Sequence, residues 1–261
     1  MGMKKGLDRL DKAIAAQTQL SRKDVHRLLS RGQILVNGET TRNFDTRIDL
    51  ENDEVTIEGQ PLVLKRHSYI MMNKPQGVVS ATSDAALPTV LDLVPEELRR
   101  NGLFPAGRLD KDTTGFVLIT NDGDFAHRIL APKSHVPKIY TATLDKPVDD
   151  GIIAAFKEGV VLKAEKHIAQ RLEDCPARRD KSTCMPARLE IVNGDPTVVR
   201  VLIRQGMYHQ IKRMFGAFDI EVVGLHRDQI GGLALDLGLE SGKCRELSKI
   251  EVEKITNTSL E

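Results

Sequence analysis

The order of short apolar runs after residue 68 restricts the fold more than any other feature of the sequence. These runs have the length and composition of β-strands, and the segments with helical spacing do not follow each strand in turn. Because strict alternation is typical of a doubly wound parallel sheet, the pattern predicts an α+β domain on a mostly antiparallel mixed sheet. The expected strands are YIMMN, GFVLIT, KIYTATL, MPARLEIV, TVVRVLI and EVVGLH, and the expected helices are TVLDLVP, DFAHRIL, DDGIIAAFKEG and YHQIKRMFGAF.

A different pattern precedes this domain. The segment LDRLDKAIAAQ has helical spacing, and a second helix is expected after Ser21, with Asp24 three positions later as its capping partner. Asn37 and Gly38 between two short apolar runs are the signal of a β-hairpin, and DEVTIEG supplies a further strand. The sequence therefore predicts a small helix-helix-strand domain over residues 1–60.

The segment from Gly59 to Ser68 shows no clear periodicity, and we expect the domain boundary there, with the larger domain over residues 68–255. Apolar residues make up 40% of the chain, yet no run approaches the roughly 20 apolar residues that cross a bilayer. A secretory leader is not evident, and three cysteines without a pattern make a poor disulfide framework. These features predict a cytoplasmic protein and exclude the membrane class.

The formal net charge of +1 hides an uneven distribution, because the first 44 residues are rich in Lys and Arg and residues 45–60 are acidic. Val25, Leu28 and Leu29 would form the buried side of the second expected helix. Its cations could lie along a phosphate backbone without reading its sequence, although an ordinary solvated face is the simpler interpretation. These cations are Arg22, Lys23, Arg27 and Arg31.

The segment GRLDKDTTG lies directly before the expected strand GFVLIT and contains two aspartates in a turn-forming context. If the segment is extended, Asp110 and Asp112 point the same way and could act as a paired general acid and base. If the segment turns, these two side chains need not point the same way. Both residues could equally serve only to stabilise the turn.

A second basic patch surrounds GMYHQIKRMFGAF, where Lys212 and Arg213 share a helix with apolar residues that would pack inward. His209 could be a base, a phosphate contact or a structural histidine. In the following segment GLHRDQIGG, His226 and Arg227 are ambiguous between loop anchors and substrate contacts.

Two groups of motifs resemble known families. The order SRKDVHRLLSRGQILVNGE, within residues 7–55, resembles the alpha-L RNA-binding module of a ribosomal protein and of many RNA-modifying enzymes. The segments GRLDKDTTGFVLITNDGDFAHRI, KIYTATL, GMYHQIKRMF and LHRDQIGG, spread over about residues 68–250, together resemble the pseudouridine synthases that modify ribosomal RNA. HQIKRMF, LHRDQIGG and the N-terminal module are most similar to the bacterial small-subunit (16S) branch, of synthase A type.

The resemblance implies specific roles for residues of these motifs. Asp110 in GRLD would be the catalytic aspartate, with Lys212 in HQIK as its cationic partner. Tyr140 in KIY would face the target base, Ile211 would close the apolar wall, and Arg108 would contact the flipped nucleotide. The other expected RNA contacts are His209, Arg213, Arg22, Lys23, Arg27 and Arg31.

The activity implied by the resemblance is the isomerisation of one uridine to pseudouridine in 16S rRNA or in the assembling small subunit, by a monomer. Asp112 does not match the catalytic position, which argues against paired carboxylates. Asp110 could act as a nucleophile or as a base. The alternatives are a large-subunit rRNA synthase and a non-catalytic RNA-binding ribosome-assembly factor, but an acid among phosphates favours an enzyme.

No cofactor is expected, because the isomerisation conserves all atoms and the redox state. Cys175, Cys184 and His167 are too widely spaced for the usual compact pairs of zinc ligands. The glycine-rich motifs of dinucleotide-binding folds and of P-loops are missing from the sequence.

Overall fold

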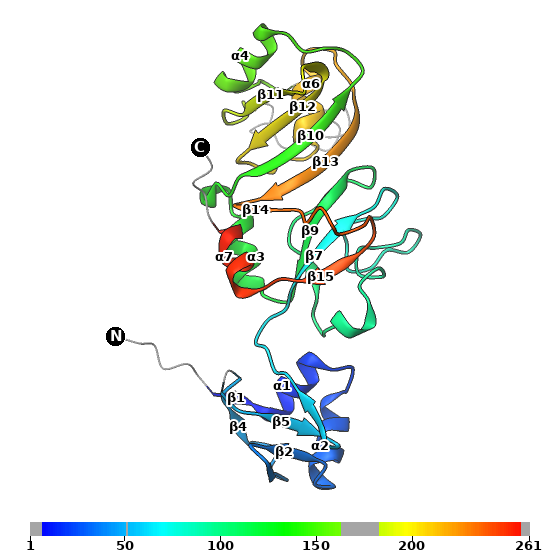
Figure 1. The fold of residues 1–261 in the computed structure, drawn as a ribbon, viewed down its shortest axis with the longest axis vertical. Helices are drawn as coiled ribbons and strands as arrows, with labels where there is room; N and C mark the ends of the chain where they lie inside the picture. Colours follow the sequence, from blue (N-terminus) through cyan, green and yellow to red (C-terminus); the bar gives the residue numbers. More distant parts are fainter. Residues whose placement is uncertain (1–6, 51, 163–182, 257–261) are drawn as a thin grey trace, which may run out of the picture.

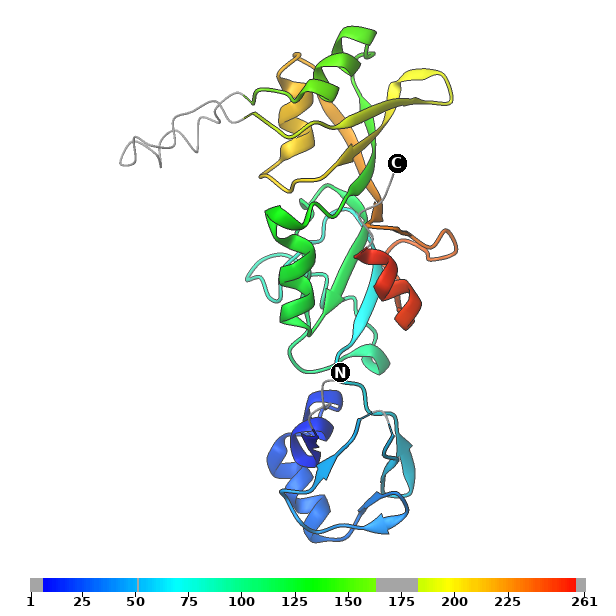
Figure 2. The ribbon, with the colours of Figure 1, turned by 90° about the vertical axis from the view of Figure 1, so that its left-hand side faces the viewer.

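The computed structural model describes residues 7–50, 52–162 and 183–256, and in these ranges the chain forms two units with separate sheets and cores. We call residues 7–64 the N-terminal unit and residues 68–256 the large unit. The two units lie end to end in an elongated molecule (Figure 1), and the side view shows the same arrangement (Figure 2).

The N-terminal unit packs two helices against small sheets. The predicted cap is present, since the Ser21 side chain accepts a hydrogen bond from the Asp24 backbone while the Asp24 side chain accepts one from Ser21. The predicted Asn37-Gly38 turn is also confirmed, with φ of 51° and 81°. Its elements are β1 (Asp8–Arg9), α1 (Leu10–Gln17), α2 (Arg22–Ser30), β2 (Ile34–Val36), β3 (Glu39–Thr40), β4 (Arg47–Ile48), β5 (Val55–Ile57) and β6 (Gln60–Leu62).

The strand order of the main N-terminal sheet is β3-β2-β5-β6, and β1 pairs with β4. β6 lies in the segment that we expected to be without periodic structure, where the short strand pairs with β5 from the edge of the sheet. Its middle residue is Pro61, which an edge strand tolerates because one side of the strand needs no partner.

The large unit is built on one mixed sheet with the strand order β11-β12-β10-β13-β9-β7-β15, as the sequence predicted for an α+β fold. Its strands are β7 (Tyr69–Lys74), β8 (Phe104–Pro105), β9 (Thr114–Thr120), β10 (Lys138–Leu144), β11 (Arg188–Val192), β12 (Asp195–Ile203), β13 (Val222–Ile230), β14 (Leu233–Ala234) and β15 (Cys244–Glu246). Its α-helices are α3 (Gly123–Leu130), α4 (Asp150–Glu158), α6 (Gln210–Gly216) and α7 (Lys249–Ile255). Two 3₁₀ turns are η1 (Glu96–Leu98) and η2 (Pro132–Ser134).

One strand pair differs from its neighbours in this sheet. β9 and β13 run parallel, with Thr114 opposite His226 and Gly115 opposite Arg227, whereas the other strand pairs among the described residues of the sheet are antiparallel. We call this parallel contact the seam. It joins an antiparallel group that contains β7 and β9 to a second that contains β10, β12 and β13.

Both faces of the sheet are covered because successive residues of its central strands point to opposite sides. In β9, Phe116 and Leu118 belong to a core that includes residues of α3 and α7, which lie side by side in Figure 1. Val117 and Ile119 belong to the core of the opposite face, which includes buried residues of α6.

The prediction of a helix over TVLDLVP is wrong. Asp92 accepts hydrogen bonds from the Thr89 backbone at 2.7 Å and from its hydroxyl at 3.0 Å, which closes a turn instead of a helix. Pro88 and Pro95 bracket the segment, and only η1 follows it. The sequence analysis also missed β8, β14, β15 and α7. None of the helices in the described ranges is long and apolar enough to cross a bilayer.

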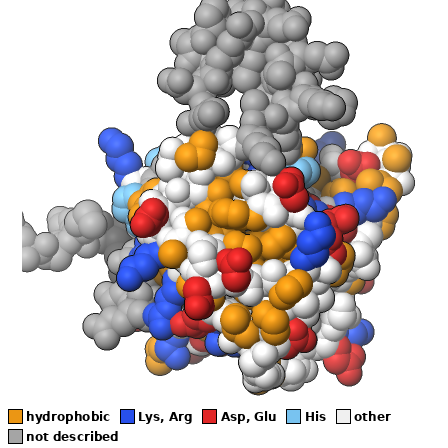
Figure 3. Space-filling view, turned by 90° about the horizontal axis from the view of Figure 1, so that it is seen from above, with side chains coloured by type: hydrophobic (Ala, Val, Ile, Leu, Met, Phe, Trp, Pro, Cys, Tyr) orange, Lys and Arg blue, Asp and Glu red, His pale blue; other side chains and the backbone are white. Residues whose placement is uncertain are grey.

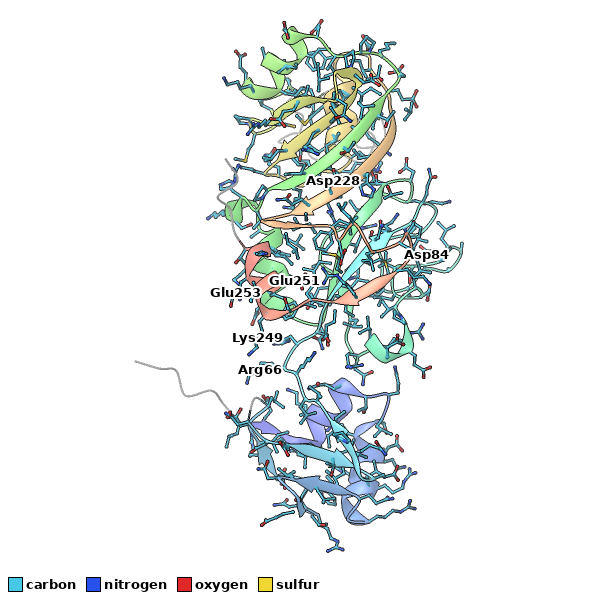
Figure 4. All side chains as sticks on the ribbon, in the orientation of Figure 1. Arg66, Asp84, Asp228, Lys249, Glu251 and Glu253 are labelled. Carbon is cyan, nitrogen blue, oxygen red and sulfur yellow. The ribbon has the colours of Figure 1, made fainter. Side chains whose placement is uncertain are left out.

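The two units contact each other directly and through the segment that connects them. The Asn101 backbone donates to the Ala16 carbonyl at 3.2 Å, and Lys65 pairs with Glu246 at 2.6 Å. A cavity of about 570 Å³ lies beside this segment, where Arg66 and Lys249 line its wall (Figure 4). Arg66 also pairs with Asp8 at 3.1 Å, so ion pairs tie the connecting segment to both units.

We predict that Gly115→Ala destabilises the protein by disrupting the seam. Gly115 has φ of +99°, and a Cβ there would overlap the Arg227 carbonyl oxygen and lie 2.7 Å from its nitrogen. The backbone conformation alone costs about 1–3 kcal/mol for a non-glycine residue. Gly242→Ala is the matched control, because Gly242 has φ of +83° with open space around it. In denaturant titrations Gly115→Ala should lose clearly more free energy of unfolding than Gly242→Ala, and equal losses would contradict the packing argument.

Candidate active site

A small cleft of about 100 Å³ opens beside the seam, between the loop before β9 and the start of α6. It collects side chains from parts of the chain that are far apart in sequence, and these include most of the residues predicted for a catalytic centre. The predicted residues that line the cleft are Arg108, Asp110, Tyr140, His209, Ile211 and Lys212.

Asp110 lies in the turn between β8 and β9, where the Thr113 backbone donates to the Asp110 carbonyl at 3.1 Å. Its side chain is partly exposed and faces two cationic or potentially cationic groups. His209 Nε2 is 3.3 Å from Asp110 Oδ1, and Lys212 Nζ is 3.7 Å from Asp110 Oδ2. The carboxylate is therefore held at the cleft between two residues at the start of α6.

Lys212 makes its shorter contact with the other aspartate of the loop. Its ammonium is 2.6 Å from Asp112 Oδ2, and this hydrogen bond lowers the pKa of the Asp112 carboxyl below its usual range. The two carboxylates thus share one lysine, in a turned segment that brings Asp110 and Asp112 to the same cation. Sequence reasoning named Asp110 as the partner of Lys212 and did not expect the closer contact with Asp112.

Tyr140 lies in β10 and is 92% buried, with its phenol directed toward the seam. Arg227 of β13 donates from Nη1 to the Tyr140 hydroxyl at 3.4 Å, and its guanidinium lies 5.9 Å from the centre of the Tyr140 ring. Arg227 also donates from Nε to the Phe116 carbonyl at 2.7 Å. The structure therefore places Arg227, which the sequence left ambiguous, as a buried link between β9 and the tyrosine of the cleft.

His226, the other ambiguous residue of that segment, also lies at the seam. Its Nδ1 is 2.8 Å from the Thr114 hydroxyl. Ile211 is buried in the wall of the cleft, whereas Arg213 lies on α6 outside the lining and donates to the Tyr208 carbonyl at 3.3 Å.

Lys74 was not predicted, yet it fixes the loop that carries both aspartates. Its side chain is fully buried at the end of β7, and Nζ donates to the carbonyls of Thr113 at 2.7 Å, Pro75 at 3.0 Å and Lys111 at 3.2 Å. These three carbonyls compensate an ammonium that would otherwise be costly to bury. The signal available in the sequence was a lysine followed by proline at the end of a continuous apolar strand.

The four cations predicted to contact RNA are exposed in the N-terminal unit, three of them on α2 and Arg31 directly after it, far along the molecule from the cleft (Figure 1). Arg22 is the most constrained of them, because its guanidinium lies 2.8 Å from the fully buried carboxylate of Asp11. Arg9 at 2.9 Å and His26 at 2.8 Å contact the same carboxylate. Burial alone would raise the pKa of Asp11, but the hydrogen bonds from these three side chains outweigh it and lower the pKa well below its usual range.

No group of three potential metal ligands occurs in the part of the chain that the structure describes. Cys184 is a buried free thiol, and His167 and Cys175 lie outside the described residues. The structure therefore does not place the set that we considered for zinc.

Comparison with known proteins gives consistent matches. Residues 68–217 match the family model described as RNA pseudouridylate synthase. The chain is 41% identical over 249 residues to ribosomal small subunit pseudouridine synthase A of Escherichia coli (strain K12), covering 95% of this chain and 99% of that protein. It is 40% identical over 246 residues to the uncharacterized RNA pseudouridine synthase YtzG of Bacillus subtilis (strain 168), covering 94% and 96%. A crystal structure of a pseudouridylate synthase aligns with a TM-score of 0.62 and 40% identity, covering 95% and 99%.

We predict that Lys74→Met changes how stability depends on pH. Burial lowers the pKa of Lys74 from an ordinary 10.5 to about 8, so between these pH values the unfolded chain binds more protons than the folded chain. The contribution of this lysine to the free energy of unfolding therefore rises as the pH rises from about 8 to about 10.5. Urea titrations should show the wild type gaining stability relative to Lys74→Met across this window. Lys111→Met, which removes an exposed lysine from the loop that Lys74 contacts, controls for the loss of one charge. A flat difference for Lys74→Met would contradict the prediction.

Proposed function

Because the chain belongs to the RNA pseudouridine synthase family, we propose that it isomerises one uridine of small-subunit (16S) ribosomal RNA, with Asp110 as the catalytic aspartate. The observation that carries the residue assignment is the position of the Asp110 carboxylate in the cleft, beside Lys212, His209 and Tyr140. The small-subunit target is supported by the relatives of that name, which match 95% of this chain. A monomer would act on free rRNA or on the assembling small subunit.

The reaction breaks the bond between ribose C1′ and uracil N1 and forms a bond between C1′ and C5. The C5 proton leaves to water and N1 gains a proton, so the atoms balance without a cofactor. In this scheme the Asp110 carboxylate acts on the sugar or the ring, either as the nucleophile or as the base. Lys212 offsets the negative charge that Asp110 and Asp112 bring into the cleft.

The other cleft residues would hold the uracil while it is detached from the sugar. The target uridine must leave its stack to reach Asp110, as for other enzymes that act on a base. The Tyr140 ring gives the base a flat apolar surface, and Arg227 fixes the hydroxyl of that tyrosine. Ile211 and Leu225 complete apolar parts of the lining, which keep water from the broken glycosidic bond. Arg108, exposed at the rim, would contact the nucleotide phosphate.

A 16S rRNA transcript labelled with tritium at uridine C5 tests the activity and its target. Wild-type protein should release tritium, and Asp110→Asn should lower the single-turnover rate by at least about 100-fold, the scale of a general acid-base contribution. Asp112→Asn is the matched control, since Asp112 lies on the same loop and contacts the same lysine. It should retain much more activity than Asp110→Asn.

The same assay separates the proposed function from the two alternatives, a large-subunit synthase and a non-catalytic assembly factor. Release only from a large-subunit transcript would overturn the small-subunit target. Tight binding to both transcripts without release from either would instead favour an assembly factor that acts by binding.

The exposed cations of α2 are proposed to bind the phosphates of the RNA. Lys23 and Arg27 are the two residues chosen to test this role. Replacing both with alanine should weaken RNA binding and reduce the slope of log affinity against log salt by about 1.4–1.8, because each lost phosphate contact contributes about 0.7–0.9. The saturated single-turnover rate should stay close to that of the wild type. Filter binding over a salt series and tritium release measure the two effects.

A control for this double variant comes from the opposite end of the molecule. There Lys157 of α4 and Arg188 of β11 are exposed. Seen from that end, the molecule shows cationic and acidic side chains around an apolar patch (Figure 3). Lys157→Ala with Arg188→Ala removes the same charge and should leave the salt slope unchanged. Equal effects of the two double variants would contradict the proposed role of α2.

A further inference from the structure

Tyr208 presents an exposed aromatic ring next to the cleft. Its side chain is 59% exposed, in contrast to Tyr140, which is buried, and to Tyr69, whose hydroxyl donates to Asp122 at 2.6 Å. These are the three tyrosines of a chain that contains no tryptophan. An aromatic ring exposed at the edge of the cleft offers a large flat surface on which a ligand can stack.

The ring of Tyr208 is connected directly to the site by a stack. It lies on the His209 ring with centroids 3.8 Å apart and planes 21° from parallel, and His209 Nε2 is 3.3 Å from Asp110. One face of Tyr208 is thus covered by a residue that contacts the catalytic aspartate, and the exposure of the side chain leaves room on the other face.

This arrangement is held by the surrounding backbone. His209 adopts the left-handed conformation with φ of 45° and ψ of 37°, which is costly for a residue with a side chain and persists only where the surrounding structure holds it. The Tyr208 carbonyl accepts a hydrogen bond from Arg213 at 3.3 Å, and the Met207 backbone donates to Gln210 Oε1 at 3.0 Å. A ring fixed in this way loses little conformational freedom when a ligand stacks on it.

We propose that Tyr208 is a stacking platform for the nucleobase next to the target uridine in the RNA. The inference rests on the proposed function, because only an RNA substrate brings such a base to this place. When the target nucleotide flips into the cleft, its neighbour loses a stacking partner, and an exposed aromatic ring beside Asp110 replaces that partner. Stacking of bases on aromatic side chains is a common mode of single-strand RNA recognition and accepts any base.

The absence of tryptophan from the sequence allows a direct test of stacking in the full-length protein. Tyr208→Trp introduces a single tryptophan whose fluorescence should be quenched when the 16S transcript binds, since a base stacked on the indole quenches it. Ile250→Trp is the control, because Ile250 is 67% exposed on α7, away from the cleft. If RNA binds both variants and quenches neither, or both to the same extent, the proposal is wrong.

A second experiment identifies the base through a double-mutant cycle on single-turnover tritium release. Tyr208→Ala should raise the RNA concentration at half-saturation about tenfold with little change in the saturated rate, while Tyr208→Phe, which keeps the ring, should behave like the wild type. An abasic nucleotide on the correct side of the target should weaken wild-type binding to the same extent and should have no further effect in Tyr208→Ala.

The outcomes separate this inference from the function on which it rests. Additive effects of Tyr208→Ala and of an abasic nucleotide on either side of the target would overturn the stacking proposal while leaving the activity intact. If the wild type released no tritium, the proposed function would fail, and the quenching of Tyr208→Trp by bound RNA would still decide whether a base stacks at this position.

Discussion

The parallel contact between β9 and β13 is the interaction on which the cleft depends. It joins the two antiparallel groups of the large sheet through two residue pairs, and Gly115 lets the strands approach at the backbone of Arg227. The loop of Asp110 enters β9 on one side of this seam. On the other side, β10 supplies Tyr140, and the segment between β12 and β13 supplies α6 with Lys212. Residues about one hundred positions apart in sequence meet there because of the strand order, not because of any local motif.

Two buried cations stabilise the geometry around the seam. Lys74 donates hydrogen bonds to the carbonyls of Pro75, Lys111 and Thr113. Arg227 donates to both the Phe116 carbonyl and the Tyr140 hydroxyl. Burying a charge is unfavourable unless its hydrogen bonds are satisfied, and Arg227 Nη2 is buried without a hydrogen-bond partner among the described residues. Replacing a buried charged group with an apolar one of similar volume is often neutral or stabilising. The position of Arg227 is therefore better explained by the orientation of Tyr140 than by stability.

The sequence predicted the parts of the fold that local signals determine. The cap at Ser21, the Asn37-Gly38 turn and the strand over 138–144 each follow from neighbouring residues, and the structure confirms them. The helix prediction for TVLDLVP failed because the apolar spacing of this segment also fits a turn closed by the Asp92 side chain. Short edge pieces such as β14 have too few residues to show a period.

The cleft was predicted in part, by motif resemblance and not by periodicity. Its named residues do come together, but the pairing of Lys212 with Asp112 and the clamp by Lys74 depend on how the loop turns in three dimensions. Spacing alone could not choose between an extended and a turned GRLDKDTTG. Arg227 stayed ambiguous for a similar reason, since its partners Phe116 and Tyr140 lie on two other strands.

The distribution of charge explains how an acidic centre can work on a polyanion. A carboxylate at an RNA surface repels the phosphates that must come near it, and here two carboxylates share a loop. Lys212 contacts both of them, so its ammonium offsets part of the negative charge within the cleft. The exposed cations of α2 lie at the other end of the elongated molecule (Figure 1). In the proposed function, general affinity for phosphates comes from the N-terminal unit, and the cleft is shaped for one flipped nucleotide and its neighbour.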